Sequence, residues 1–170
     1  MNIAPATLDD ALGIAAVHVR SWQAAYAGIL KPEFLDFLSL ERRAEQWCDI
    51  LQQQESQTLV AHEPAGITGF VSSGRWRDES ATVSQGEIWA LYVQPEEWSK
   101  GLGQALLNAA IQELRAAGRH TVFLWVLSEN SRGVRFYQSF GFEPVQGSAK
   151  LFQIGGSEVE EVCLRLQHDA

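Results

Sequence analysis

One continuous segment, Gly86–Leu127, constrains the fold more than any other part of the chain. Gly86–Val93 is rich in β-branched and aromatic residues, which predicts a central strand, and Pro95 ends it because proline cannot donate to a strand ladder. Gly101–Ala117 repeats leucine and alanine every four residues, which predicts an amphipathic helix. Thr121–Leu127 is almost entirely apolar, as is typical of a strand buried on both faces. This strand–helix–strand crossover predicts a three-layer α/β or α+β domain.

The rest of the sequence supplies further helices and strands. Thr7 and Asp10 form a capping pair that opens a helix ending near Gly28, and a second helical region runs from Pro32 through Leu38 and resumes after Ser39 to about Leu51. The other expected elements are a helix at Ser131–Ser139 and strand-like segments at Asn2–Pro5, Thr58–Ala61, Ile67–Ser72, Gly141–Pro144, Lys150–Gln153 and Glu158–Leu166. We therefore predict one domain over residues 1–170, of α/β (α+β) class, in which helices flank a central mixed sheet of six or seven strands.

Composition excludes several functional classes. A hydrophobic share of 46% is too high for a disordered chain. The chain has 13 basic and 21 acidic residues, a net charge of −8, and its basic residues form no run, which argues against nucleic acid as a partner. The same acidity suits a cationic partner such as an amine, although many acidic proteins owe their charge only to solubility.

Cysteine spacing and hydropathy bear on disulfide bonds, metal sites and the cellular compartment of the protein. Cys48 and Cys163 lie far apart and show no metal-ligand spacing, so we expect neither a disulfide framework nor a metal site. Acidic residues stand near the N-terminus where a signal peptide needs an apolar run, and the longest apolar run, Val122–Leu127, is far too short to span a membrane. We expect a cytoplasmic protein without a membrane partner.

The glycine-rich turn before the helix predicts an anion site. Closely spaced glycines at a helix N-terminus let backbone N–H groups approach a ligand, and Lys100 adds a formal charge. A tight turn that needs glycine only for its dihedral angles explains one Gly-x-Gly equally well. A P-loop is excluded because Lys100 precedes the glycines and Gln104 stands where a hydroxyl residue is required. A dinucleotide fingerprint needs a small residue at the position of Leu106 and a turn directly after the strand. Neither requirement is met, so this fingerprint is excluded as well.

Two motifs in this region resemble those of the GNAT superfamily of N-acetyltransferases. The first is the coenzyme A loop, Arg/Gln-x-x-Gly-x-Gly/Ala after a Val-x-Pro strand end, which here reads Val93-x-Pro95 and then Trp98-Ser99-Lys100-Gly101-Leu102-Gly103. Trp98 stands where the family has Arg or Gln. The second is Asn-x-x-Ala-x-x-Phe-Tyr-x-x-x-Gly-Phe, matched from Asn130 to Phe142 with Gly133 in place of Ala. Two matches in the expected order favour the family more strongly than either alone.

The resemblance implies a GNAT fold in which the strands ending at Val93 and near Leu127 splay apart, with the pantetheine arm of acetyl coenzyme A between them. It assigns acetyl coenzyme A binding to Leu91, Tyr92, Val93, Trp98, Ser99, Lys100, Gly101, Leu102, Gly103, Gln104, Asn130, Arg132, Phe136 and Tyr137. It also implies that the Val93 backbone N–H stabilises the reacting carbonyl oxygen. Tyr137 would donate to the departing thiolate, although a core aromatic with a satisfied hydroxyl is the plainer interpretation of one tyrosine.

Acceptor-side residues are less well defined. An alkylammonium has a pKa near 10.4 and must lose a proton before it attacks. Glu87 is our candidate for receiving that proton, directly or through water, although a glutamate at a strand end is usually only solvated. Trp22 and Tyr26 lie on one helix face and resemble the acceptor side of a bacterial GNAT branch, although such a stripe is more often core. Trp76 is a candidate for a second wall of the acceptor site.

The sequence thus predicts acetyl transfer from acetyl coenzyme A to a primary amine of a small molecule or peptide. Direct attack in a ternary complex is expected, because no Cys or Ser stands in a nucleophile motif. Two alternatives remain: a non-catalytic module that senses acyl coenzyme A, and an oxidoreductase that binds a nicotinamide or flavin at the glycine loop. The segment from Lys150 to Leu166 could also form a homodimer edge.

Overall fold

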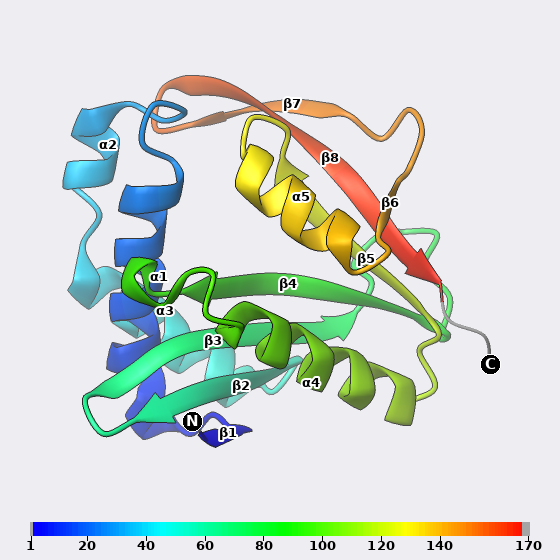
Figure 1. Ribbon diagram of the computed structural model, residues 1–170, viewed down its shortest axis with the longest axis horizontal. Coiled ribbons are helices and arrows are strands. Elements are labelled where there is room, and N and C mark those ends of the chain that lie inside the picture. Colours follow the sequence, from blue (N-terminus) through cyan, green and yellow to red (C-terminus); the bar gives the residue numbers. More distant parts are fainter. Residues whose placement is uncertain (1, 168–170) are drawn as a thin grey trace.

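The computed structural model describes residues 2–167 and has one twisted sheet at its centre. The strands are β1 (Asn2–Pro5), β2 (Ser56–Glu63), β3 (Gly66–Arg75), β4 (Gln85–Val93), β5 (Thr121–Leu127), β6 (Glu143–Pro144), β7 (Lys150–Ile154) and β8 (Ser157–Gln167). The helices are α1 (Ala11–Ala25), α2 (Pro32–Asp36), α3 (Leu40–Gln53), α4 (Leu102–Ala116) and α5 (Ser131–Ser139), with short 3-10 turns at Leu8–Asp10 and Pro95–Glu97. Figure 1 shows this arrangement.

Within residues 2–167 the sheet has eight strands in the order β1-β2-β3-β4-β5-β8-β6, with β7 paired to β8, which confirms the expected mixed sheet flanked by helices and adds one strand to the upper expected number. Each strand corresponds to a strand-like segment of the sequence, and the short segments join the sheet by pairing with longer strands. β6 is two residues long and is a strand because Glu143 and Pro144 pair with β8. Every pairing is antiparallel except that of β4 with β5, as the crossover through α4 requires.

β4 and β5 diverge along their length, which confirms the expected splay. Their parallel register covers only Gln85–Ile88 against Thr121–Leu124. Beyond Ile88, β4 keeps its partner β3 on one side, while β5 stays paired with β8 along its whole length. The two strands therefore separate like the arms of a fork (Figure 1). The carboxyl-terminal half of β4 keeps one edge without a strand partner among the described residues.

A β-bulge in β4 changes which side chains share a face. Ser72 pairs with Ala90 and Ser73 with Ile88, so Trp89 is the extra residue on β4. In a regular strand the side chains alternate between the two faces, so Glu87 and Tyr92 would project from opposite faces of the sheet. The bulge shifts this alternation, so that Glu87 and Tyr92 project from the same face of the sheet.

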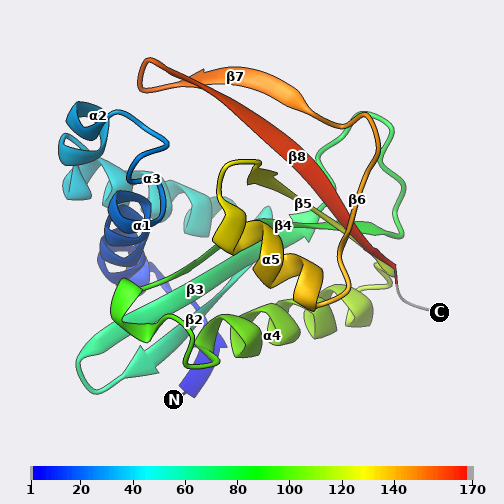
Figure 2. The ribbon, with the colours of Figure 1, turned by 45° about the horizontal axis from the view of Figure 1, so that its top comes forward.

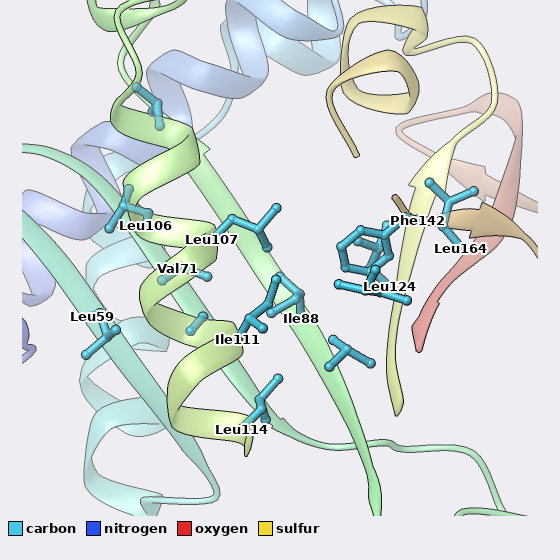
Figure 3. Close-up of a cluster of buried hydrophobic side chains, with 14 of the residues drawn as sticks. Leu59, Val71, Ile88, Leu106, Leu107, Ile111, Leu114, Leu124, Phe142 and Leu164 are labelled. Carbon is cyan, nitrogen blue, oxygen red and sulfur yellow. The ribbon is translucent and has the colours of Figure 1, made fainter. Parts of the chain in front are cut away.

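Helices cover both faces of the sheet. Along β2 and β3, successive side chains alternate between two cores: Leu59 and Val71 pack under α4, whereas Val60 and Phe70 pack against α1 and α3. Figure 2 shows α4 and α5 on one side and α1 to α3 on the other. The buried face of α4 consists of Leu102, Leu106, Leu107, Ala110, Ile111 and Leu114, and Figure 3 shows several of these directed toward Ile88 of β4.

A third apolar cluster joins the C-terminal hairpin to the N-terminal helices. Tyr26, Leu30 and Leu35 pack against Leu127 and Val159. The backbone N–H of Lys31 donates to Ser157 Oγ at 3.1 Å, which fastens the tip of the β7–β8 hairpin to the start of α2. The hairpin therefore packs against the end of β5 and the segment that follows α1.

Local signals placed the helix ends well. Thr7 N–H donates to Asp10 Oδ2 at 2.7 Å, as expected of a capping pair. The expected break at Ser39 is confirmed, because Ser39 is extended and its Oγ accepts the N–H of Arg42 at 3.2 Å, which starts α3 anew. None of the described helices is long and apolar enough to cross a membrane.

Truncating the core beneath α4 should test this packing. Leu107 is 0% exposed, so Leu107→Ala should lower the free energy of unfolding by ~2–5 kcal/mol through lost burial and a residual cavity. Leu151 on β7 is 66% exposed, and Leu151→Ala should change stability by less than about 0.5 kcal/mol. Urea denaturation followed by circular dichroism measures both. Equal losses would contradict the assignment of Leu107 to the core.

Candidate functional site

A cavity of about 600 Å³ lies where β4 and β5 diverge. Strands β4, β5 and β8, helices α1 and α5 and the glycine loop before α4 all contribute to its wall. It brings together most of the residues singled out in the sequence: Trp22, Tyr26, Glu87, Leu91, Tyr92, Val93, Trp98, Ser99, Gly101, Gly103, Gln104, Asn130, Arg132, Phe136 and Tyr137.

Three predicted site residues lie outside this wall. Trp76 stacks on Phe123, with ring centroids 3.9 Å apart and planes 10° apart, so its ring is used in packing on β5. Lys100 is not part of the wall and pairs with Glu97 at 3.2 Å. Leu102 is buried in the core beneath α4. Sequence position could not reveal these directions, because each residue is adjacent to one that does face the cavity.

The free edge of β4 presents backbone groups to the cavity. Gln94 N–H donates to Thr68 O at 2.8 Å, so the neighbouring pair of Val93 with Gly69 is of the non-hydrogen-bonded kind. By the same alternation, the N–H groups of Leu91 and Val93 point away from β3 and into the fork. An extended ligand with amide groups could pair with this edge as an added strand.

The Val93 carbonyl is held by two side chains. Ser21 Oγ of α1 donates to it at 2.9 Å, and Trp98 Nε1 donates at 2.8 Å. The guanidinium of Arg132 lies 4.4 Å from the centroid of the Trp98 ring. Trp98 therefore has a structural reason to replace the family's Arg or Gln: it secures the end of β4 and supports a cation at the mouth of the cavity.

The glycine loop has the geometry of an anion cradle. Gly101 precedes α4 with a φ of 89° and Ser99 has a φ of 63°, so the chain turns sharply into the helix, whose first N–H groups have no acceptor within the helix. The N-terminus of α4, a helix of 15 residues, adds its positive dipole end. Arg132 and Arg135 reach the cavity wall from α5. Together these groups supply positive charge within an acidic chain.

Tyr137 lies on α5, in a mostly apolar setting. Its ring packs against Phe136 and Phe142 at centroid distances of 5.1 and 5.8 Å. Burial raises the pKa of Tyr137 well above its usual range, and the nearby Tyr92 adds to that increase. The hydroxyl is therefore protonated at neutral pH and available as a hydrogen-bond donor toward the cavity.

Asn130 begins α5 and shapes the opposite side of the same wall. Its Oδ1 accepts the N–H of Gly133 at 3.0 Å, which caps the helix. A Cβ at Gly133 would lie 2.7 Å from Asn130 Nδ2, so glycine in place of the family's alanine leaves room for this amide.

Glu87 is not the solvated strand-end glutamate that position alone suggested. It is 2% exposed and lines the cavity. Its Oε2 accepts the backbone N–H of Arg77 at 3.0 Å and the Nε of Arg77 at 3.2 Å, while a terminal guanidinium nitrogen binds Oε1. The guanidinium lies 4.6 Å from the centroid of Trp89, the bulge residue. Both carboxylate oxygens of Glu87 are thus already engaged.

The cavity wall also contains residues that sequence reasoning missed, chiefly Arg77 and Glu161. Burial raises the pKa of Glu161; Glu87 adds to that increase, while Arg77 and Lys150 oppose it. A signal for Glu161 was present in the sequence, because an acid stands between two apolar residues, Val159 and Cys163, of the same strand face. Because side chains on one face of a strand recur every two residues, this pattern places the Glu161 carboxyl on an apolar face.

His18 forms a neutral support behind this wall. Its ring stacks on Tyr92, with centroids 4.7 Å apart, and its Nδ1 accepts a hydrogen bond from Trp47 Nε1 at 3.2 Å. Burial lowers the pKa of His18 to about 3, and the positive charge of Arg43 contributes. His18 therefore carries no charge at neutral pH.

Comparison with known proteins points to one family. Residues 20–142 match the sequence profile of the acetyltransferase (GNAT) family. The uncharacterized N-acetyltransferase YuaI of Bacillus subtilis is 30% identical, over 96% of this chain and 91% of its own length. The L-methionine sulfoximine/L-methionine sulfone acetyltransferase of Salmonella typhimurium is 31% identical, over 72% of this chain and 71% of its own.

Among solved structures, the acetyltransferase yncA of Salmonella typhimurium, determined with its cofactor acetyl-CoA, is similar along the full chain. It is 26% identical, its TM-score is 0.76, and the match covers 100% of this chain and 95% of that one. The resemblance found in two short motifs therefore extends to the whole fold.

The neutral state of His18 should make stability depend on pH. Between pH 6.5 and 3 the unfolded chain binds a proton at His18 that the folded chain does not, so stability is lost as pH falls. From pH 7 to pH 5 the wild type should lose about 2 kcal/mol more than His18→Phe, in which this titration is absent. Urea denaturation at both pH values measures the difference, and parallel losses would contradict it.

Proposed function

Because the chain belongs to the acetyltransferase (GNAT) family, we propose that it transfers an acetyl group from acetyl coenzyme A to the primary amine of a small, amino-acid-like molecule. One observation carries the proposal: a single cavity contains the free backbone edge of β4, the anion cradle before α4 and the protonated phenol of Tyr137. The β4 edge can pair with the pantetheine amides of an acyl coenzyme A, the cradle can bind its diphosphate, and the phenol can donate to its sulfur.

The residues present fit acetyl coenzyme A. Its diphosphate would bind the N–H groups of the loop around Gly101 and Gly103, helped by Arg132. Its pantetheine amides would pair with the edge of β4 at Leu91 and Val93. The coenzyme supplies an activated acetyl thioester, and the side chains around it supply orientation and proton control.

Proton control at the leaving sulfur falls to Tyr137. A thiolate is a better leaving group when a hydrogen-bond donor meets it, and the Tyr137 hydroxyl keeps its proton at neutral pH. The backbone N–H groups of Leu91 and Val93 face the fork, where they can stabilise negative charge on the acetyl oxygen. These donors are held in place by the sheet, so little reorganisation is needed during reaction.

The acceptor would enter from the side of α1. Trp22 and Tyr26 form its aromatic wall, with ring centroids 5.1 Å apart in an edge-to-face arrangement. Glu87 orders Arg77 at the same end, and we propose that this pair helps to position the acceptor. An amino-acid-like acceptor is supported by the similarity to an enzyme named for methionine sulfoximine and methionine sulfone.

Coenzyme binding should be measured first. At about 100 times its Kd, acetyl coenzyme A should stabilise the fold by about 2.7 kcal/mol, which corresponds to a rise in Tm of roughly 5–10 °C. NAD(H) and FAD at the same concentration should leave the Tm unchanged. Differential scanning fluorimetry makes the comparison, and stabilisation by the dinucleotides alone would favour an oxidoreductase instead.

Turnover tests the role of Tyr137. Tyr137→Phe should lower kcat by ~10²-fold while acetyl coenzyme A still raises the Tm as in the wild type. Gln138→Ala, an exposed neighbour on α5, is the matched control and should keep full activity. Thiol release is measured against a panel of amino acids, polyamines, aminoglycosides and peptides. An unchanged rate in Tyr137→Phe would remove the hydroxyl from the mechanism, and coenzyme binding without thiol release from any amine would favour a sensor.

A further inference from the structure

We propose that the Glu161 carboxylate, on β8, binds the acceptor ammonium and takes its proton. This inference rests on the proposed function and assigns the base to a different residue from Glu87. Four observations carry it: the position of Glu161 in the sheet, its lack of a partner, the engagement of Glu87, and the charges around both.

Glu161 occupies the acceptor end of the fork. It lies directly across from Leu127, the last residue of β5, and from Lys150 of β7. Because opposite residues in an antiparallel pair project to the same face, Glu161 shares the face of Leu127, which packs against α1. Its side chain lines the same cavity as Tyr26 and Tyr137.

The carboxylate of Glu161 has no hydrogen bond or ion pair within residues 2–167. The cation across from it, Lys150, instead places its Nζ 4.3 Å from the centroid of the Trp125 ring. A half-buried carboxylate that lacks a partner carries a desolvation cost, and a cationic ligand would offset that cost. Glu161 is therefore prepared for an ammonium group that enters the cavity.

Glu87 is less suited to the same task. Its oxygens accept three hydrogen bonds from Arg77, two from side-chain nitrogens and one from the backbone. Protonating Glu87 would leave the Arg77 guanidinium, whose side chain is about half exposed, without its anion. The pair is better suited to ordering the loop that ends at β4, and Glu87 then acts as a positioning residue.

The charges facing Glu161 come from every element around it. Arg77 from the β3–β4 loop and Lys150 from β7 favour the carboxylate, whereas Glu87 from β4 opposes it. The hydroxyls of Tyr26 and Tyr92 are protonated, since burial raises the pKa of both. The net result is a carboxyl whose pKa lies above its ordinary value, which makes its anion a stronger base.

The proton balance of the reaction is complete with these groups. The ammonium gives one proton to Glu161 and becomes a neutral amine, whose lone pair forms the C–N bond. The C–S bond breaks and its electron pair goes to sulfur, which takes a proton from Tyr137. The second N–H proton leaves the amide nitrogen and restores Tyr137, while Glu161 releases its proton to solvent. The products are the acetamide, the free thiol and one proton.

The dependence of kcat/KM on pH tests the inference. With Glu161 as base, the wild type should show a plateau between the pKa of this carboxyl and that of the amine, because the enzyme binds the ammonium form. Glu161→Gln has no base at this position and can use only the free-amine form of the acceptor. Its kcat/KM should therefore rise about tenfold per pH unit up to the amine pKa. The deficit should be roughly 10²- to 10³-fold at pH 7 and should shrink toward pH 10.

Two further variants separate this role from structural effects. Glu158→Gln removes the same charge from an exposed position on β8 and should keep the wild-type plateau. Glu87→Gln should lower kcat/KM without tilting the profile. Stabilisation by acetyl coenzyme A should be equal in all three variants, which shows that each folds and binds.

Three outcomes are decisive. A flat profile for Glu161→Gln within threefold of the wild type overturns the inference and leaves the proposed function intact. A tilted profile for Glu87→Gln alone returns the role to Glu87. If the wild type acetylates no amine of the panel, the proposed function fails, and the assignment of a base fails with it.

Discussion

The parallel pairing of β4 with β5 ends at Ile88, and the candidate site depends on this early end. If the parallel pairing continued past Ile88, the N–H groups of Leu91 and Val93 would hydrogen-bond to β5, and no cavity would open between the strands. Instead, β5 follows β8, whose ladder with it runs the full length of β5, while β4 follows β3. The resulting fork opens the cavity and leaves a hydrogen-bonding edge inside it. The two strands can separate because β4 stays paired with β3 and β5 stays paired with β8.

Side chains around the fork keep its geometry fixed. Ser21 and Trp98 hold the Val93 carbonyl from opposite sides, and Arg132 covers the Trp98 ring. The Arg77–Glu87 pair ties the β3–β4 loop to the start of the fork. These interactions join α1, the glycine loop and α5 to one strand end. A chain with a net charge of −8 thereby brings the cations Arg77, Arg132 and Arg135 to the wall of its cavity.

The GNAT resemblance, the order of elements and most helix ends could be predicted from the sequence, because each rests on local patterns. Glycine spacing, the Asn130–Phe142 motif and the four-residue repeat of α4 are visible in a linear chain, and the family match over residues 20–142 agrees with them. The number of strands was harder to predict, since Gly141–Pro144 is strand-like in sequence but joins the sheet only because Glu143 and Pro144 pair with β8. Trp76 was expected at the acceptor wall and stacks on Phe123 instead, a choice that depends on a strand distant in sequence.

The sequence by itself determined the type of fold and the glycine turn before α4, because periodicity and glycine placement act within a few residues. Only the tertiary structure decided which carboxylates line the cavity. The bulge at Trp89 turns Glu87 to the same face as Tyr92, and the pairing of β8 with β5 brings Glu161 to the end of the fork. Both depend on strand register, and register is set by contacts between strands rather than by the residues of one strand. As a result of that register, Arg77 hydrogen-bonds to the Glu87 carboxylate, whereas the Glu161 carboxylate has no hydrogen bond or ion pair within residues 2–167.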